Sequence, residues 1–449
     1  MIPSLRNSPP LAGCLSKFRS DRRGNIAIAS ALLAPVLLGT FGLGTEVASW
    51  YSMKRQMQNA VDSAATAAAT NASDDFADEA KAVTARYGLA SGAAGVVVTA
   101  LDAQACPDGS NECYRVTVTK PVPLSLATLV GYKGDTTVNG APAIMLSATA
   151  LAVLGTSPRP YCIVALAHSG ASQAIRTNGA PMADLTGCNV MSNTDAVCNG
   201  HDLLADVGDA HGTNDGCGIK RNSGLKPLTD QYAAKASQIP TVPCSSFPSI
   251  PQKKRDASLP PENQLSGQVS ISSTPKAVCG DLQLTGDTTI NTDATGGVLV
   301  IRNGDLDLNG YKLMTADGSA VTILFTGENG PNYSHTLTGD GVLDIEAPKT
   351  GPWSGMAVYE NPTLTQNVDI NYAGNSPTWN ITGMVYAPNA KTTFSGAVNK
   401  SSHGASCFTL MVDSLLVNGT GSILSKGECK KAGVQMPTGP VPSRGKLVS

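Results

Sequence analysis

The sequence is poor in charge and in aromatic side chains. Of its 449 residues, 15% are charged and 5% are Phe, Trp or Tyr, and the formal net charge at pH 7 is −2. Nucleic-acid binding depends on clustered Lys and Arg side chains that neutralise phosphates, and the sequence has no such stripe. We therefore predict no nucleic-acid partner.

Motifs for metal, nucleotide or nucleophile chemistry are also missing. The sequence contains no CxxC, HxxxH, Gly-x-x-x-x-Gly-Lys or Gly-x-Ser-x-Gly pattern, and its five His residues are scattered. Asp305 and Asp307 alternate with two leucines, which places both carboxylates on one face of a predicted strand. A glycoside-cleaving site also needs aromatic and cationic support, and both are scarce here. We predict no enzyme, no cofactor and no metal site.

Almost all cysteines lie on the C-terminal side of a long apolar run. Cys14 precedes a long apolar run, and ten cysteines follow it. An even set on one side of a membrane segment suits an oxidising compartment, so we predict disulfides there, with metal ligation as the alternative. The ten are Cys106, Cys113, Cys162, Cys188, Cys198, Cys217, Cys244, Cys279, Cys407 and Cys429.

The apolar run is long enough to cross a bilayer. Residues 26–45 contain no charge, and twenty residues of helix span about 30 Å. Five Lys or Arg and one Asp precede the run, while acidic residues follow it, so the positive-inside rule places the N-terminus in the cytoplasm. We predict a cytoplasmic basic segment at 1–25 and a transmembrane helix at 26–47.

A cleavable signal peptide is the alternative, because small residues stand at 47–49. The run is longer than the roughly 7 to 15 residues of a signal h-region. The helical pattern also continues, which predicts an amphipathic helix over 48–88 and favours a retained anchor. The apolar members of that stripe are Trp50, Met53, Met57, Ala60, Val61, Ala64 and Ala68.

Several residues of the predicted anchor, which begins at Ile26, allow close contact with other helices. Gly39, Gly42 and Gly44 are small, and Pro35 is tolerated where neighbours satisfy the freed carbonyl. Glu46 stands at the exported end of the span. We interpret it as an interfacial carboxylate that reaches water; the alternative is a partner charge for another subunit's helix.

This region resembles the N-terminal part of TadG-like proteins of the tight-adherence (Tad, Flp pilus) apparatus. The motifs that carry the resemblance are Arg23-Gly24-Asn25, the apolar run with Pro35, Trp50-Tyr51 and the stretch 56–65. Pilins of such systems have Glu at the fifth position after the processing Gly, where this chain has Ala29. The departure argues against prepilin-type cleavage.

The resemblance implies a component of pilus assembly and adhesion in the bacterial inner membrane, with most of the chain in the periplasm or touching the outer membrane. Its implied partners are the membrane, crossed once, and other Tad/Flp assembly subunits or pilins. Segments between residues 162 and 359 also resemble the exported part of TadG-like proteins. The resemblance is to members that lack a von Willebrand A domain, because the Asp-x-Ser-x-Ser metal motif of that domain does not occur in this sequence.

The exported chain is predicted to be mainly β. Alternating segments at 89–157 indicate a small α+β module, with a turn that a Cys106–Cys113 disulfide can close. Short apolar bursts at 158–430 favour a right-handed parallel β-helix, and a β-sandwich is the alternative. A Pro-rich linker is predicted at 251–264 and a flexible tail at 431–449.

Two functions remain open at this point. The first is a membrane-anchored assembly protein that acts by association. The second is a surface or periplasmic protein that binds or cleaves carbohydrate, with envelope polysaccharide as its partner, on the same β scaffold.

Overall fold

The chain folds as two compact units. The computed structural model describes residues 25–71, 75–107, 109–252, 258–272, 274–398, 406–419 and 422–448. The first unit comprises Met1–Ser157 and Pro442–Ser449, and the second comprises Pro158–Val441. Of the predicted basic segment 1–25, all but the last residue lies outside the described residues.

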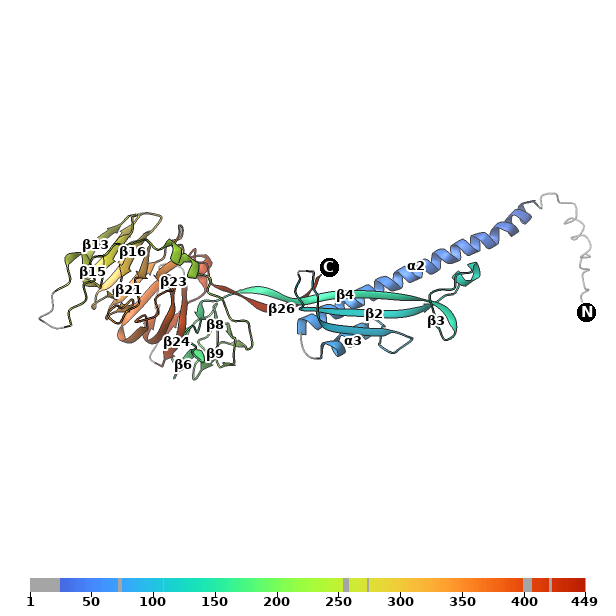
Figure 1. The fold of residues 1–449 in the computed structure, drawn as a ribbon, viewed down its shortest axis with the longest axis horizontal. Helices are drawn as coiled ribbons and strands as arrows, with labels where there is room; N and C mark the ends of the chain where they lie inside the picture. Colours follow the sequence, from blue (N-terminus) through green and yellow to red (C-terminus); the bar gives the residue numbers. More distant parts are fainter. Residues whose placement is uncertain are drawn as a thin grey trace, which may run out of the picture. The chain divides into compact units, whose positions relative to one another are not determined.

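A single long helix, α2 (Asn25–Asn71), begins the described chain (Figure 1). It continues from the apolar run into the predicted stripe without a break and contains Pro35. The predicted helix over 48–88 is in fact divided: α2 ends at Asn71, and the shorter helix α3 (Phe76–Arg86) follows. Small and apolar residues of α2 that are fully buried include Met57, Ala60, Val61, Ala64, Ala65, Ala68 and Ala69.

The two helices pack on a sheet in the first unit. Its strand order is β1 (Val97–Gln104), β2 (Cys113–Pro123), β4 (Ala141–Pro160) and β26 (Thr438–Val448), and β3 (Thr136–Val138) pairs with β4. The β1–β2, β2–β4 and β3–β4 pairs are antiparallel. Val116 and Val118 of β2 are buried in one cluster with the apolar face of α2. Because alternate strand residues share a face, this side of the sheet forms the core of the unit.

The end of the chain differs from the flexible tail predicted for residues 431–449. Residues 438–448 form β26, which pairs beside β4. In the same unit, the Gly445 amide donates a hydrogen bond to the Thr70 hydroxyl of α2 at 2.8 Å. Prolines, glycines and charges interrupt the apolar alternation of this strand, so its pattern is obscured in the sequence.

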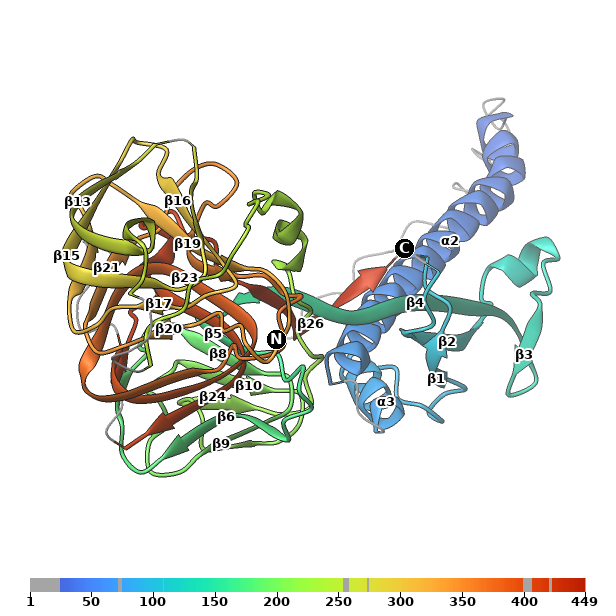
Figure 2. The same ribbon diagram turned by 60° about the vertical axis from the view of Figure 1, so that its left-hand side comes forward.

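The second unit consists mainly of short strands (Figure 2). Among its described residues, the pairings are parallel. The first group of strands is β5 (Ile163–Ala165), β6 (Gln173–Asn178), β7 (Met182–Asp184), β8 (Asn189–Ser192), β9 (Asp195–Cys198), β10 (Val207–Ala210), β11 (Asn214–Asp215) and β12 (Lys220–Asn222). The second group is β13 (Gln264–Ile271), β14 (Lys276–Cys279), β15 (Leu282–Thr292), β16 (Gly297–Arg302), β17 (Leu306–Asp307), β18 (Lys312–Thr315), β19 (Val321–Thr326), β20 (Leu337–Thr338), β21 (Val342–Glu346), β22 (Met356–Glu360), β23 (Ile370–Val398), β24 (Phe408–Asn418) and β25 (Ser422–Leu424).

Parallel pairing places similar side chains in line within the core. Leu282 of β15 pairs with Leu306 of β17, which pairs with Leu337 of β20. All three are buried, and the register therefore builds a continuous apolar column. A second column contains Leu299, Ile323 and Val358. A β-sandwich is built from antiparallel sheets, so these ladders do not match that alternative.

The order of the ladders is not the order of the sequence. Leu410 of β24 pairs with Ile163 of β5, and Ile163 pairs with Val190 of β8. The first strands of the unit are therefore added next to its last long strand. The connection from β12 to β13 has to return along the outside of the sheet, and its residues 223–252 are called the crossing segment below.

The predicted linker at 251–264 includes residues 253–257, which lie outside the described part of the chain. Its described part ends in a 3-10 helix, η4 (Pro261–Asn263). Leu259 and Asn263 are buried, and the Asn263 side-chain amide donates to the carbonyls of Cys279 and Asp281 at 2.9 and 2.6 Å. This part of the segment is packed against the second unit rather than forming a free bridge.

Candidate functional site

The carboxylate of Glu46 is buried against a turn of its own chain. Its side chain is 9% exposed. Oε1 accepts a hydrogen bond from the Ser125 amide at 2.6 Å, and Oε2 accepts from the amides of Leu126 and Ala127 at 2.9 and 2.6 Å. These amides lie at the start of the 3-10 helix η2 (Ala127–Val130), where backbone N–H groups lack partners within the helix.

Neither sequence-based interpretation of Glu46 includes this contact within the chain. Glu46 is 9% exposed, and the hydrogen-bond partners of its carboxylate are three backbone amides of its own chain. Residues 125–127 have no charged or motif-like side chains, and the contact uses only their backbone amides. The one signal available in the sequence is a carboxylate at the end of an apolar helix, which needs some compensating group.

Two glycines of the predicted anchor face the same turn. A Cβ placed on Gly42 would lie 3.0 Å from Leu126 Cδ1, and one on Gly39 would lie 3.8 Å from Val130 Cγ1. Gly44 has open space at the corresponding position. Gly42, and less closely Gly39, therefore allow the η2 segment to approach α2, a contact within one chain instead of the helix-to-helix contact that the sequence suggested.

The rest of the apolar helix is uncovered. Pro35 lies on an exposed turn, and the backbone of Ile26 belongs to α2. Only 6% of the helix's most apolar stretch is buried inside the protein, and the helix is long and apolar enough to cross a membrane. Its exposed large side chains are Ile28, Leu32, Leu33, Val36, Leu37, Phe41 and Val47. Exposed apolar side chains along a helix of this length suit contact with lipid or with other helices.

Residues 24–71 match the TadE/G-like Flp pilus-assembly family. The resemblance of the N-terminal region is thereby confirmed, and the matched residues, called the TadE/G-like segment below, contain all of described α2. No curated protein and no solved structure matches the chain. The match covers the uncovered apolar part of α2 and its buried stripe, and it does not extend to the sheet or to the second unit.

Outside the TadE/G-like segment, Asp305 and Asp307 are engaged with their own chain. Asp305 Oδ1 accepts from the Thr336 amide at 2.9 Å, and Asp307 Oδ2 accepts from the Gln283 side chain at 2.7 Å. Burial raises the pKa of Asp305 to about 6, and the charges of Asp281 and Asp307 add to this effect. Leu306, between the two carboxylates, is fully buried as the alternation predicts.

A cleft of about 590 Å³ opens beside these strands. Among the described residues that line it, Tyr333 is the one aromatic and Asp369 the one carboxylate. Asp369 Oδ1 accepts a hydrogen bond from the Lys391 amide at 3.0 Å. Neither Asp305 nor Asp307 lines the cleft. This lining lacks converging acids and stacked aromatics, and it gives no support for a polysaccharide ligand.

The crossing segment covers an apolar outer face of the second unit. That face includes Tyr161, Val164, Met191, Val300, Leu324, Met356, Tyr359, Met384, Tyr386 and Met411. The Tyr386 hydroxyl donates to Asp230 Oδ2 at 2.7 Å, and Tyr359 donates to the Tyr232 carbonyl at 3.1 Å. Burial raises the pKa of Tyr232 to about 12, with a contribution from the charge of Asp230. The segment therefore seals the face with apolar contacts and hydrogen bonds.

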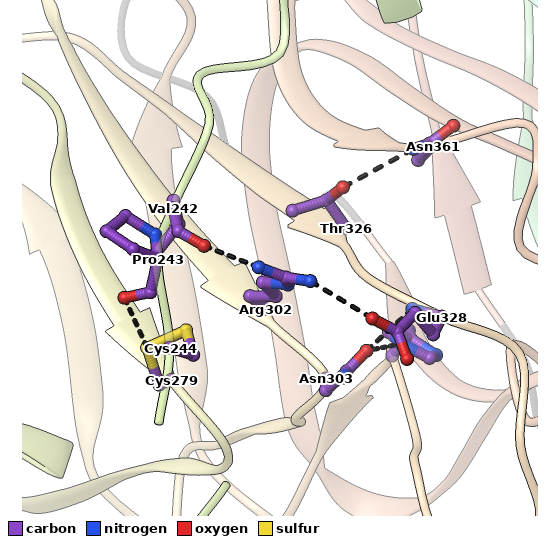
Figure 3. Close-up of polar contacts among 10 residues, drawn as sticks. Val242, Pro243, Cys244, Cys279, Arg302, Asn303, Thr326, Glu328 and Asn361 are labelled. Carbon is purple, nitrogen blue, oxygen red and sulfur yellow. Dashed lines mark hydrogen bonds and ion pairs between the residues drawn. A yellow bond between two sulfur atoms is a disulfide. The ribbon is translucent and has the colours of Figure 1, made fainter. Parts of the chain in front are cut away.

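Two further links fix the far end of the crossing segment (Figure 3). The Arg302 guanidinium donates to the Val242 carbonyl at 2.5 Å and pairs with Glu328 at 3.1 Å. Cys244 of the segment forms a disulfide with Cys279 of β14. The outer face under the segment is thus unavailable as a binding surface while these links are intact.

The ten cysteines that follow the TadE/G-like segment form five disulfides. Four lie in the second unit and one in the first. The Cys106–Cys113 bond closes the turn between β1 and β2. The remaining pairs are Cys162–Cys188, Cys198–Cys217, Cys244–Cys279 and Cys407–Cys429. No cluster of metal-ligating side chains occurs within the part of the chain that the structure describes.

Proposed function

We propose that this protein is a membrane-anchored component of Flp/Tad pilus assembly that acts through protein association. The observation that carries the proposal is the uncovered apolar surface of α2, which lies within the segment that matches the pilus-assembly family. In the proposed topology the N-terminus is cytoplasmic, the apolar part of α2 crosses the inner membrane once, and the sheet of the first unit and the whole second unit lie in the periplasm.

The second unit is proposed to be a right-handed parallel β-helix that presents its walls to partner subunits or pilins. Parallel ladders with in-line apolar columns support this architecture, because each coil of a β-helix buries its strands against the next coil. Crossovers between parallel strands are right-handed in nearly all proteins, which supports the handedness. Five disulfides suit an oxidising compartment.

No catalytic step is part of the proposal. The two carboxylates that could form an acid pair bind groups of their own chain, and the nearby cleft contains neither of them. The role in adhesion follows from pilus assembly and not from a sugar-binding surface of this chain.

The anchor is tested by placing charge in the uncovered helix. The variant Leu32→Arg/Leu33→Arg should be released from membranes by alkaline carbonate, because each Arg at the centre of a span costs about 2.5 to 3.5 kcal/mol. Val97→Arg/Leu101→Arg is the matched control, since both residues are exposed on β1 of the first unit. Release of the unaltered protein, or a mature N-terminus near Ser49, would overturn the anchor.

The assembly role is tested in a bacterium that makes Flp/Tad pili. Deleting the protein should abolish pili and surface adhesion, and the unaltered chain should restore both. The variant Asp305→Asn/Asp307→Asn should restore them equally well. Normal pilus formation without the protein would refute the assembly role, and failure of a folded double-Asn variant would reopen the enzyme hypothesis.

A further inference from the structure

The apolar loop, residues 121–132, lies between Lys120 and Lys133 and contains no charged residue. It joins β2 to the region before β3 and includes η2. Leu124 and Ala127 are among its buried side chains. Four large side chains of the loop stay exposed: Leu126 (42%), Leu129 (79%), Val130 (52%) and Tyr132 (43%).

The loop lies beside the apolar part of α2 and not only beside the segment that follows Glu46. Val130 is next to Gly39 and Leu126 is next to Gly42. Gly39 precedes Glu46 by seven residues, which corresponds to about 10 Å along a helix. The neighbouring helix side chain Phe41 is 73% exposed. If α2 crosses the bilayer, the tip of the loop therefore reaches the level of the lipid tails.

Groups suited to a membrane interface stand at the other end of the loop. The rings of Trp50 and Tyr132 are 6.2 Å apart, and Tyr51, which follows Trp50 in the sequence, is exposed. Trp and Tyr concentrate at the membrane–water boundary, and Lys side chains extend their charge into water from the same level. Lys120 and Lys133, which bound the loop, fit that position.

Glu46 removes the main obstacle to this placement. A carboxylate near the lipid boundary is costly unless it is hydrogen-bonded, and Glu46 accepts three backbone hydrogen bonds from the loop itself. The same bonds satisfy amides at the start of η2 that would otherwise need water. The hydrogen bonds between Glu46 and the loop thus satisfy both the carboxylate and the loop amides without water.

We propose that the apolar loop inserts into the periplasmic leaflet of the membrane as a second, non-spanning anchor, with Leu129 and Val130 among the lipid tails. The inference rests on the proposed crossing of the bilayer by α2. Lipid is favoured over a second protein because the exposed loop and the exposed face of α2 form one apolar surface at the same level. Its consequence is that the first unit is held in a fixed orientation against the bilayer.

The test uses spin labels on the full chain in vesicles of phosphatidylethanolamine and phosphatidylglycerol. Cys14→Ser provides the background, because the ten other cysteines are in disulfides. Leu129→Cys reports on the loop, Phe41→Cys on the span and Leu101→Cys on an exposed strand in water. Collision with oxygen, which enriches in lipid, is compared with collision with a water-soluble nickel chelate.

The expected result is a high oxygen-to-nickel ratio for Leu129→Cys, close to that of Phe41→Cys and well above that of Leu101→Cys. A water-like ratio at Leu129 with a lipid-like ratio at Phe41 would overturn loop insertion and leave the anchor intact. Water-like ratios at both positions would refute the anchor itself. A third outcome is low collision with both reagents at Leu129, together with spin–spin broadening that disappears on dilution with unlabelled chain. This outcome would overturn lipid insertion and show that the loop contacts a second copy of the chain.

Discussion

The Glu46 carboxylate of α2 binds the backbone amide of Ala127, 81 residues away in the sequence, at 2.6 Å. The contact joins the TadE/G-like segment to a loop that lies outside the family match. A residue that looks like an ordinary interfacial acid in the sequence therefore connects the apolar part of α2 to the folded part of its own unit.

Glu46→Gln should loosen the apolar loop without releasing the protein from the membrane. A Gln side chain places an N–H donor where one of the acceptors stood, and hydrogen bonds to a charged group contribute about 1.5 to 3 kcal/mol each. Hydrogen exchange of the full chain in detergent should become faster over residues 124–132. Asp102→Asn, at an exposed position of β1, is the control. Unchanged exchange in Glu46→Gln would show that the three contacts do not hold the loop.

Asp305→Asn should change how stability depends on pH. The pKa of Asp305 in the folded protein is raised to about 6, above the ordinary value of 3.8, so the folded state binds the proton more tightly than the unfolded state. The stabilisation from that proton is complete below about pH 4 and is lost as the pH rises through about 6.

The variant cannot lose a proton at this position, so its stability relative to the unaltered protein should rise between pH 4 and pH 7. Urea unfolding of the second unit at several pH values measures this difference. Asp317→Asn, at an exposed position of the same unit, serves for comparison. A difference between Asp305→Asn and the unaltered protein that does not vary with pH would contradict the prediction.

Removing the Cys244–Cys279 disulfide should free the crossing segment. The bond closes a separation of 35 residues, for which chain entropy gives a stabilisation of about 4 kcal/mol. In Cys244→Ala/Cys279→Ala we expect faster proteolysis within residues 223–252 and binding of a hydrophobic dye to the uncovered Tyr and Met side chains. Cys106→Ala/Cys113→Ala lies in the other unit and should leave this segment protected. Equal protection in both variants would mean that Arg302 and the apolar contacts suffice.

Gly445→Val should weaken the first unit. A Cβ at this position would lie 2.5 Å from the Thr66 carbonyl oxygen and 3.0 Å from Ala69 Cβ, so β26 must move away from α2. Overpacking of this kind costs about 1 to 3 kcal/mol. The midpoint of unfolding of the first unit should fall, whereas Lys446→Ala, at an exposed neighbour, should leave it unchanged. An unaltered midpoint in Gly445→Val would show that β26 contributes little.

Sequence patterns locate the helices and strands whose burial depends on residues close together in the chain. The apolar run and the stripe from Met57 to Ala68 are continuous in the chain, so their periodicity alone locates the helix and its buried face. The alternation at 305–308 likewise identifies Leu306 and Leu308 as core residues.

Contacts between distant segments follow no local pattern. Periodicity shows that β5 and β24 are buried strands, but it cannot show that Ile163 pairs with Leu410. The partners of Glu46 are backbone amides, which every residue except proline has, and so they leave no trace in side-chain chemistry. The strand at 438–448 is recognised only through β4, because its own prolines and glycines suggest a coil.

The return of the C-terminus to the first unit makes the second unit an insertion between β4 and β26. The sheet of the first unit is consequently incomplete until β26 has been synthesised and has paired with β4. A chain that stops early, or that is cut within the second unit and loses its end, leaves the edge of β4 unpaired, and such an edge invites aggregation or degradation. Pairing of β26 with β4 thereby makes the folding of the first unit depend on an unbroken chain through the second unit.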